Sequence, residues 1–506
     1  MNEAAAASAG DVHPAADARR LAGELVAALA LDLPAYGTQA AAGLELDGIK
    51  LGPALEQQLF FALRDGRRPA TGWRSIANRV ARLPLLAGAA IAPFVPGRSP
   101  DPGPGPVVAL LREKVHLSTL MRIEEELRGL TGQPIAILRV GRAARGTVPH
   151  GLAPPLWRLM SRRMLRLTLA HRRLLPAVRK AARTSWAEIL GPSPHAGELA
   201  EVAVGELERI ALGAAALSSA VDAWEPTILV AFDEVGTWAR LLPAVAERHG
   251  IPSLDLPHAE AADVEAITGA AYDRMAVYGP HAAEVLRRAG IASERVVVIG
   301  APRFDALADL VNDADATGDA AGAPSAGMPR RIIFAGQYPT AALSLQMIDE
   351  GLRAAVAAAV RAAPAEVVAV PHPAEPPGLL RGLLEAVDAP PGVTVRLADG
   401  DLYDCLPAAW LLVTCWSNSV LEAVALGVPA VTVHGDGPAP VDFAADRLAL
   451  AAVDADSAAD IAGQLLEPGA RERHIATAAE ALSERVGPAL GNASQRAAQL
   501  IAEMQQ

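Results

Sequence analysis

Two adjacent carboxylates follow an apolar run near the middle of the chain. Residues 227–232 have the composition of a buried strand, and Asp233 and Glu234 come directly after it. A carboxylate in a partly desolvated site can have its pKa raised toward the value at which it takes a proton from a hydroxyl group. The pair therefore predicts a general base, with the second carboxylate orienting the base or its substrate. Alternatively, Glu234 only begins the next helix, where the helix dipole favours acidic side chains.

A histidine stands between two prolines at the end of a second apolar run. His372 follows the predicted strand 366–370 and precedes Pro373, which favours an extended backbone and leaves the imidazole projecting from the strand end. An imidazole in that place can donate a hydrogen bond to a departing phosphate and offset its developing charge. A purely structural histidine is the alternative.

A Ser-Asn-Ser corner follows a third apolar run, at 411–415. Ser417, Asn418 and Ser419 lead into a short helical segment and another apolar run, a pattern that predicts strand, helix and strand. Such a crossover directs the helix N-terminus and its backbone N–H groups toward the carboxyl edge of a parallel sheet, where anionic ligands bind. The corner therefore predicts a phosphate site. Ser419 and Glu422 also match the capping-box pattern, which would account for both residues without a ligand.

Composition and charge narrow the class of protein. A chain of 506 residues, 51% of them hydrophobic, predicts two or more domains with sizeable cores. The net charge of −12 argues against general nucleic-acid binding, because a polyphosphate favours a basic surface. Cys405 and Cys415 are too few for a disulfide framework and lack metal-ligand spacing. With no signal-peptide pattern and no run of about 18 apolar residues, we expect a cytoplasmic protein without a membrane span.

One segment, 158–183, is strongly basic and contains no acidic residue. A solvated helix face accounts for such a run in an ordinary domain. The sharper interpretations are a peripheral helix facing anionic lipid at the inner face of the membrane, or a binding surface for a polyanionic acceptor. The basic residues are Arg158, Arg162, Arg163, Arg166, Arg172, Arg173, Arg179, Lys180 and Arg183.

Apolar runs alternate with helical patterns over most of the chain, which predicts parallel sheets in an α/β fold. We expect an Ala-rich, mostly helical N-terminal extension with a short strand pair at 44–51, ending in a Pro/Gly linker, over 1–105. Two Rossmann-like domains follow at 106–308 and 330–485, joined by a linker at 309–329, and a helix ends the chain at 486–506. The first domain carries the basic helical insertion. The predicted strands are 106–111, 134–140, 227–232, 252–256, 274–278, 295–299, 331–335, 366–370, 393–397, 410–414 and 430–433.

This organisation resembles the GT-B architecture of nucleotide-sugar glycosyltransferases, in which two Rossmann-like domains face a cleft. Residues 275–307, with their GAPRFD corner, are similar to the end of the first domain in capsule and surface-polysaccharide glycosyltransferases. The order of Asp233-Glu234, His372-Pro373 and the two serines resembles the acidic, His-Pro and serine motifs of bacterial sialyltransferases and polysialyltransferases. CDP-glycerol glycerophosphotransferases share a similar layout. The chain departs from the pattern by an inserted Val235 and by Asn418 between the serines, which leaves the sugar open.

The resemblance implies a nucleotide donor site in the second domain and an acceptor site in the first. Glu422 resembles the acid that holds the donor ribose in many GT-B enzymes. Arg303, in the corner between the domains, either binds phosphate or forms a hinge ion pair. The donor-binding residues would be Arg303, Gly336, His372, Pro373, Ser417, Asn418, Ser419 and Glu422.

We therefore expect an inverting, metal-independent glycosyltransferase with Asp233, Glu234 and His372 as catalytic residues. The donor would be a CMP-activated acidic sugar such as sialic acid, or another nucleotide-activated sugar, and the acceptor a cell-surface glycan or glycoconjugate. No cofactor beyond the nucleotide sugar is expected, and no metal, because His372 and the helix N-terminus can hold the phosphate instead. The alternatives are a sugar-nucleotide epimerase or hydrolase of similar fold, and a catalytically silent GT-B binding subunit.

Overall fold

The structure, a computed structural model, describes most of the chain. The described residues are 15–36, 43–64, 103, 105–112, 116–140, 154–191, 194–257, 263–308, 329–339, 343–372, 375–376, 378–434, 441–487 and 491–506. The predicted linker at 309–329 lies outside them except for its last residue, as do Pro373 and most of the Pro/Gly linker before residue 106. Among the described residues, no helix is both long and apolar enough to cross a membrane.

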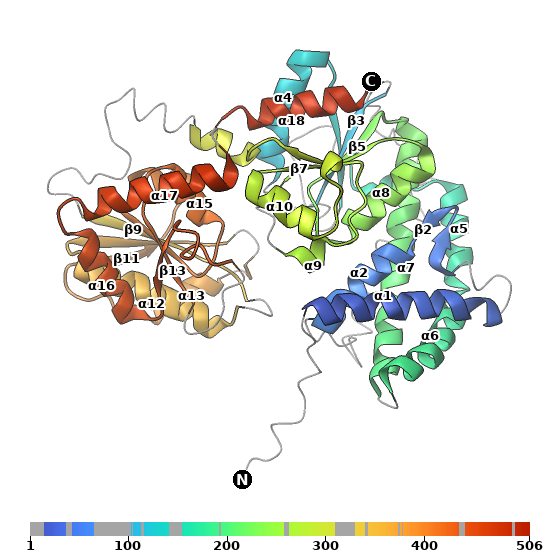
Figure 1. Ribbon diagram of the computed structural model, residues 1–506, viewed down its shortest axis with the longest axis horizontal. Helices are drawn as coiled ribbons and strands as arrows, with labels where there is room; N and C mark the ends of the chain where they lie inside the picture. The colour runs from blue at the N-terminus through green and yellow to red at the C-terminus, as the bar shows by residue number, and fades with distance from the viewer. Residues whose placement is uncertain are drawn as a thin grey trace, which may run out of the picture. The chain divides into compact units, whose positions relative to one another are not determined.

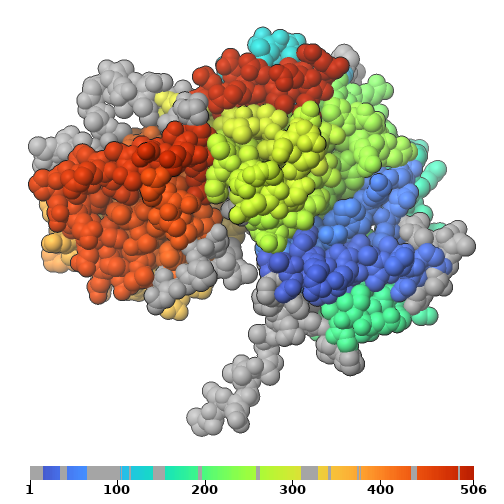
Figure 2. Space-filling model, viewed as in Figure 1, coloured from blue at the N-terminus to red at the C-terminus, as the bar shows by residue number. Residues whose placement is uncertain are grey.

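The chain forms two compact units. Unit 1 contains residues 1–277, 283–297 and 495–506, and unit 2 contains residues 278–282 and 298–494. This grouping differs from the predicted ranges at both ends of the chain. The N-terminal helices pack on other helices of unit 1, and residues 495–506, which include most of the last helix, α18 (Ala493–Met504), also belong to unit 1. Figure 2 shows α1, in blue, lying against α6, in turquoise.

Unit 1 is built on a six-stranded sheet with the order β4-β3-β5-β6-β7-β8. The strands are β3 (Val107–Leu111), β4 (Ile135–Arg139), β5 (Ile228–Ala231), β6 (Ser253–Asp255), β7 (Arg274–Val277) and β8 (Val296–Val298). The registers from β4 to β7 are all parallel. Every residue of β3 and β5 is buried, as expected for parallel strands covered on both faces. All six strands lie where the apolar runs predicted them.

The N-terminal helices and the insertion between β4 and β5 form one helical group, in which α1 packs on α2 and α6, and α7 packs on α2, α5, α6 and α8 (Figure 1). A short antiparallel pair, β1 (Glu45–Leu46) and β2 (Ile49–Lys50), turns at Asp47 and Gly48, both with positive φ, as a tight hairpin requires. The predicted strand pair at 44–51 is thus confirmed. The helices of this part of the chain are α1 (Ala15–Asp32), η1 (Leu33–Tyr36), α2 (Gly52–Arg64), α4 (Leu117–Thr131), η6 (Leu156–Leu159), α5 (Arg162–Arg172), α6 (Leu175–Leu190), α7 (Pro194–Trp224), α8 (Trp238–His249), α9 (Val264–Ile267), α10 (Pro280–Arg288) and η7 (Ser293–Arg295).

Unit 2 contains a second six-stranded parallel sheet, with the order β11-β10-β9-β12-β13-β14. Its strands are β9 (Arg330–Ala335), β10 (Ala365–Val370), β11 (Val393–Leu397), β12 (Leu411–Thr414), β13 (Ala430–Val433) and β14 (Leu450–Ala452). Its helices are η8 (Pro302–Phe304), α12 (Leu345–Arg361), α13 (Leu379–Glu385), α14 (Leu402–Cys405), η9 (Leu406–Ala408), α15 (Ser419–Ala425), α16 (Ala455–Leu465) and α17 (Ala470–Val486). The sequence predicted five of these strands and missed β14.

Helices cover both faces of the second sheet, and side chains alternate between them along each strand. In β9, Ile332 and Phe334 belong to the core formed with α12 and α16. The intervening Ile333 and Ala335 belong to the opposite core, formed with α15 and α17. Both sheets are therefore inner layers of α/β sandwiches, whose strand ends are the places where ligands can approach.

Candidate functional site

Each sheet has one point where the strand order reverses. In unit 1, β4 is added on one side of β3, whereas β5, β6, β7 and β8 are added in turn on its other side. The reversal therefore lies between β3 and β5. In unit 2 it lies between β9 and β12. Ligands of open α/β sheets bind outside the carboxyl ends of the strands at this switch point. Asp233 follows β5, and Gly336 and the Ser417–Ser419 corner follow β9 and β12, so the predicted residues lie at both switch points.

Asp233 is held at the switch point of unit 1. Its carboxylate is buried, and Oδ1 accepts hydrogen bonds from Nη1 of Arg112 at 3.0 Å and from the backbone N–H of Gly236 at 2.7 Å. Oδ2 is buried and has no hydrogen-bond partner among the described residues. Arg112 directly follows β3, so its ion pair with Asp233 joins the two strands on either side of the switch point.

Two further residues at this edge escaped the sequence analysis. Asp255, at the end of β6, accepts the backbone N–H of Asp233 on Oδ1 at 3.0 Å. Burial, and then the charge of Glu234, raise the pKa of Asp255 well above its usual value. The ring of His116 stacks on Phe232, with the centroids 5.5 Å apart. In the sequence, these two residues could have been found as an acidic residue at the end of the strand after β5 and a histidine after the first strand of the sheet.

Glu234 is also buried, but it does not begin a helix. Helix α8 starts at Trp238, with Thr237 as its N-cap, so Glu234 lies outside the first turn. The alternative explanation through the helix dipole is therefore wrong. Asp233, Glu234 and Asp255 together place three carboxylates at one sheet edge. Among the described residues, however, no group of three or more His, Cys, Asp and Glu side chains is arranged to hold a metal ion.

The switch point of unit 2 is bridged by a glutamine that the sequence analysis did not identify. Oε1 of Gln337, after β9, accepts a hydrogen bond from the backbone N–H of Trp416, after β12, at 3.1 Å. Beside it, Ser417 Oγ accepts the backbone N–H of Ser419 at 3.2 Å. The Ser419 hydroxyl is buried and has no hydrogen-bond partner among the described residues. A buried hydroxyl without a partner is costly, which marks this corner as a place where a ligand oxygen would be stabilised.

The capping-box interpretation of Ser419 and Glu422 is wrong. The N-cap of α15 is Asn418, which makes no side-chain hydrogen bond to the helix, and Ser419 is already the first helical residue. Glu422 instead lies deep in the unit, at 1% exposure, where it forms an ion pair with Arg303. The structure thus shows an ion pair at Arg303, and phosphate binding by this residue stays a prediction.

A tyrosine completes this ion pair, in which Glu422 is buried and the Arg303 side chain is 31% exposed. Tyr403 in α14 donates its hydroxyl hydrogen to Oε1 of Glu422 at 3.0 Å. Burial raises the pKa of Glu422, while Arg303 and Tyr403 oppose that shift. Burial also works against the charge of Arg303, but the Glu422 carboxylate more than offsets it, so the pKa of Arg303 is raised. Glu422 therefore ties α15 to the corner at 302–304, a contact that the ribose role implied by the resemblance does not require.

His372 lies after β10 with its ring beside Tyr338, which follows β9. The two rings are 4.9 Å apart at 53°, so the imidazole lies toward the strand that borders the switch point. The backbone N–H of His372 donates to Oε2 of Glu375 at 3.3 Å. Gly336 has a packing role: a Cβ there would lie 2.9 Å from the carbonyl oxygen of Val370. Pro373 lies outside the described residues.

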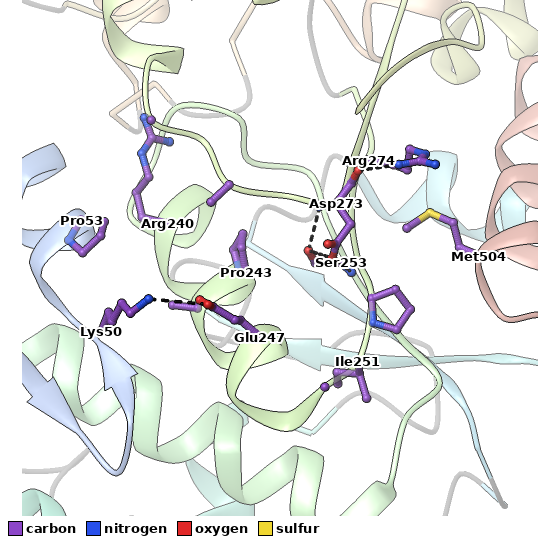
Figure 3. Close-up of a pocket in the computed structure, with 15 residues that line it drawn as sticks. Lys50, Pro53, Arg240, Pro243, Glu247, Ile251, Ser253, Asp273, Arg274 and Met504 are labelled. Carbon is purple, nitrogen blue, oxygen red and sulfur yellow. Dashed lines mark hydrogen bonds and ion pairs between the residues drawn. The ribbon is translucent and has the colours of Figure 1, made fainter. Parts of the chain in front are cut away.

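The structure groups these residues by unit. Asp233 and Glu234 belong to unit 1, and the described donor-binding candidates belong to unit 2. A cavity of about 830 Å³ in unit 1 contains none of them. Its lining follows α8 from Arg240 to Gly250 and reaches Ser253 and Arg274, at the amino ends of β6 and β7. Within it, Ser253 bonds to Asp273 and Lys50 pairs with Glu247 (Figure 3).

The basic segment 158–183 meets acidic side chains from other elements. Four of its arginines pair with three carboxylates, and the arginine side chains stay 41–60% exposed. Exposed pairs of this kind stabilise a fold by about 0–1 kcal/mol each. The contacts favour the interpretation as a solvated helix face. The pairs are Arg163–Asp47, Arg172–Glu208, Arg179–Glu201 and Arg183–Glu201.

Comparison with solved structures places this arrangement among known folds. A putative UDP-N-acetylglucosamine 2-epimerase from Listeria monocytogenes superposes with a TM-score of 0.51 and 13% sequence identity, over 79% of this chain and 96% of that one. The fold is of the GT-B type. The GT-B fold agrees with the two parallel sheets and with the predicted pair of Rossmann-like domains.

Two further structures match the chain less well. The UDP-GlcNAc 2-epimerase from Neisseria meningitidis, bound to UDP-GlcNAc, has a TM-score of 0.47 and 14% identity over 79% of this chain and 98% of that one. The wall teichoic acid polymerase TagF has a TM-score of 0.48 and 12% identity over 85% and 95%. No family model matches the sequence, and no curated protein matches it. The GT-B assignment therefore rests on the Listeria structure and the sheet topology.

Proposed function

We propose that this chain is a metal-independent, inverting glycosyltransferase that uses a nucleotide-activated sugar. The observation that carries the proposal is that residues suited to this reaction lie at the switch points of both sheets. The switch point of unit 1 holds the buried Asp233, whose Oδ2 has no partner among the described residues, and that of unit 2 holds the buried Ser419 hydroxyl, which also has none there. His372 follows β10, the strand next to β9 in the same sheet. A base and an anion site are the two elements that transfer from a phosphate leaving group to a hydroxyl needs.

In the proposed reaction, Asp233 is the base. Its Oδ1 is oriented by Arg112 and Gly236, which leaves Oδ2 to take the proton of the acceptor hydroxyl. The acceptor oxygen bonds to the anomeric carbon as the bond from that carbon to the phosphate oxygen breaks, and the nucleotide leaves with the electron pair. Glu234 orients the acceptor or the base. Direct displacement of this kind inverts the anomeric carbon.

The donor nucleotide would bind at the switch point of unit 2. Ser417, Asn418 and Ser419 supply hydroxyl and backbone N–H groups for the phosphates, and His372 donates a hydrogen bond to the leaving phosphate. The ion pair between Glu422 and Arg303 would hold α15 against the corner at 302–304. From the order of the motifs, we propose a CMP-activated acidic sugar such as sialic acid as the specific donor, and a cell-surface glycan as the acceptor.

A second candidate follows from the Listeria match. A sugar-nucleotide epimerase or hydrolase of the same fold would act on the donor alone, and the Listeria protein is described as a putative UDP-N-acetylglucosamine 2-epimerase. The buried carboxylates could then move a proton on the sugar ring and not on an acceptor. Fold alone does not decide between the two reactions.

Nucleotide release separates the candidates. The protein is incubated with CMP-, CDP-, UDP- and GDP-activated sugars, with and without glycan acceptors, and released nucleotide and sugar products are measured. The proposal predicts release that requires the acceptor. A changed sugar or released nucleotide without acceptor would favour the second candidate. Binding of a donor without any turnover would instead indicate a binding subunit and would contradict both enzymatic proposals.

A further inference from the structure

The loop that carries the acidic pair is held by a buried glutamine from the N-terminal region. Gln57 in α2 is fully buried, and its amide uses all of its hydrogen-bonding capacity. Nε2 donates to the carbonyl oxygens of Val235, at 2.5 Å, and Ala266, at 3.0 Å. Oε1 accepts from Nη2 of Arg19, at 2.8 Å, and Nη2 of Arg240, at 3.0 Å. Val235 lies directly between Glu234 and Gly236, so Gln57 contacts the backbone of the acidic loop itself.

Arg240 contacts the same loop from α8. Its side chain is 3% exposed, and Nη1 donates to the carbonyl oxygen of Glu234 at 3.3 Å. Nη2 also donates to the carbonyl oxygens of Ala266 and Thr268 at 2.8 and 2.7 Å. Burial lowers the pKa of Arg240 to about 10, so the side chain stays charged at neutral pH. Two consecutive carbonyl groups of the loop, those of Glu234 and Val235, thus have buried side-chain donors.

A third contact fixes the far end of the loop. Gln58, the next residue of α2, donates from Nε2 to Oγ1 of Thr237 at 2.7 Å. Without these donors, buried carbonyl groups would lack partners, and the loop would shift to find others. A shift of about 1 Å in a reacting group is enough to slow catalysis about a hundredfold.

We propose that Gln57, together with Arg240, is a positioning residue for the acidic loop 233–237. Helix α2 therefore contributes to the geometry of the proposed catalytic site. The proposal rests on the proposed role of Asp233 and Glu234. It assigns a role to the N-terminal region, which the sequence analysis described only as a helical extension.

The test replaces Gln57 with residues of similar size. Gln57→Met removes all four hydrogen bonds. Gln57→Glu keeps an acceptor for Arg19 and Arg240 but removes the donor to Val235, and it serves as the second variant if Gln57→Met does not fold. Gln505→Met is the matched control, because Gln505 donates to Gln133 and Thr227 elsewhere in unit 1, next to the amino end of β5.

The primary readout is hydrogen exchange of the backbone amides in a peptide that covers 232–240. Both Gln57 variants should exchange there about tenfold faster or more, because the loop opens locally, while peptides of β9 and β12 stay at the wild-type rate. For the reaction, kcat should fall about tenfold or more while KM for the donor changes less than about twofold, since the proposed donor site lies in unit 2. The Gln505→Met control should match the wild type in both measurements.

The proposal would be overturned by unchanged exchange at 232–240 in both Gln57 variants, or by faster exchange spread evenly over unit 1. Wild-type behaviour of Gln57→Glu would also contradict it, because the donor to Val235 would then be dispensable. Failure of the proposed function would be seen in a different experiment, as full turnover by Asp233→Asn. That result would not change the hydrogen-exchange result for the Gln57 variants.

Discussion

Gly236 and Asp233 lie too close together for any other residue to replace the glycine without movement. The backbone N–H of Gly236 donates to Oδ1 of Asp233 at 2.7 Å, and a Cβ at position 236 would lie 2.4 Å from both carboxylate oxygens. The same Cβ would lie 2.6 Å from Nη1 of Arg112. The glycine thus lets the carboxylate, the arginine and the backbone converge.

Gly236→Ala should displace the Asp233 carboxylate and lower kcat about tenfold or more, because proton transfer depends on its position. Nucleotide affinity should not change. Gly205→Ala in α7 is the control, because a Cβ placed there has no described atom within 4 Å beyond its chain neighbours and the backbone of its own helix. Steady-state kinetics and nucleotide titration check both variants. Equal kcat values for Gly236→Ala and the wild type would mean that the position of Asp233 does not limit the reaction.

Glu422→Gln should destabilise unit 2 strongly. The change leaves Arg303 without its buried counter-charge, and breaking such a pair costs about 3 kcal/mol in the free energy of unfolding. Glu484→Gln is the matched control, because its ion pair with Arg447 is exposed and should contribute about 0.5 kcal/mol or less. Urea unfolding of both variants measures the difference. A loss in Glu422→Gln as small as in the control would show that Arg303 is well solvated without its partner.

Asp255 should make the stability of unit 1 depend on pH. Because burial and the charges of Glu234 and Asp233 raise its pKa, the folded state binds this proton more tightly than the unfolded state. The resulting stabilisation is complete below the unfolded pKa of about 3.9 and is lost as the pH rises through the folded pKa. Asp255→Asn keeps the acceptor for the Asp233 N–H but cannot ionise, so its free energy of unfolding should not fall in this way as the pH rises. Urea unfolding of both proteins from acid to neutral pH should then give curves that diverge as the pH rises; parallel curves would refute the assignment.

The basic segment gives a prediction about partners. Arg163 and Arg172 are exposed but pair with Asp47 and Glu208 of the same unit. Because these pairs favour a solvated helix face, we expect that replacing Arg162, Arg163, Arg172 and Arg173 with Gln leaves binding to anionic liposomes and polyanionic glycans unchanged at low salt. If the segment instead bound a membrane or a polyanion, the variant would bind more weakly than the wild type. Binding by the wild type would also weaken as salt rises, because the Debye length is only about 10 Å at 0.1 M. Liposome sedimentation at two salt concentrations distinguishes these results.

The sequence predicted the sheets well because parallel strands are buried on both faces and appear as short apolar runs. It missed β14 because residues 448–462 are rich in alanine and lack the run of β-branched residues seen in β10. The corners after β5, β10 and β12 were predicted, since polar residues at strand ends are visible in one chain segment.

Contacts between distant segments could not be predicted in the same way. Arg112 and Asp233 are 121 residues apart, and Gln57 and Val235 are 178 apart. No local pattern distinguishes Gln57 from its neighbour Gln58. The capping-box prediction failed for a related reason: the pattern at Ser419 and Glu422 is local, but Glu422 is buried on Arg303 from another segment. Tertiary contacts decided the role of each of these residues.

The most direct test of the central claim is calorimetric titration of CMP, CDP, UDP and GDP into three proteins: the wild type, Asp233→Asn and His372→Ala. We expect at least one nucleotide to bind the wild type and to bind Asp233→Asn with a Kd within about twofold, because Asp233 belongs to unit 1 and the proposed donor contacts belong to unit 2. His372→Ala should weaken that nucleotide about tenfold or more, as expected for a lost hydrogen bond to a charged phosphate. Absence of nucleotide binding to the wild type, or a loss of affinity in Asp233→Asn as large as in His372→Ala, would contradict a donor site at the switch point of unit 2.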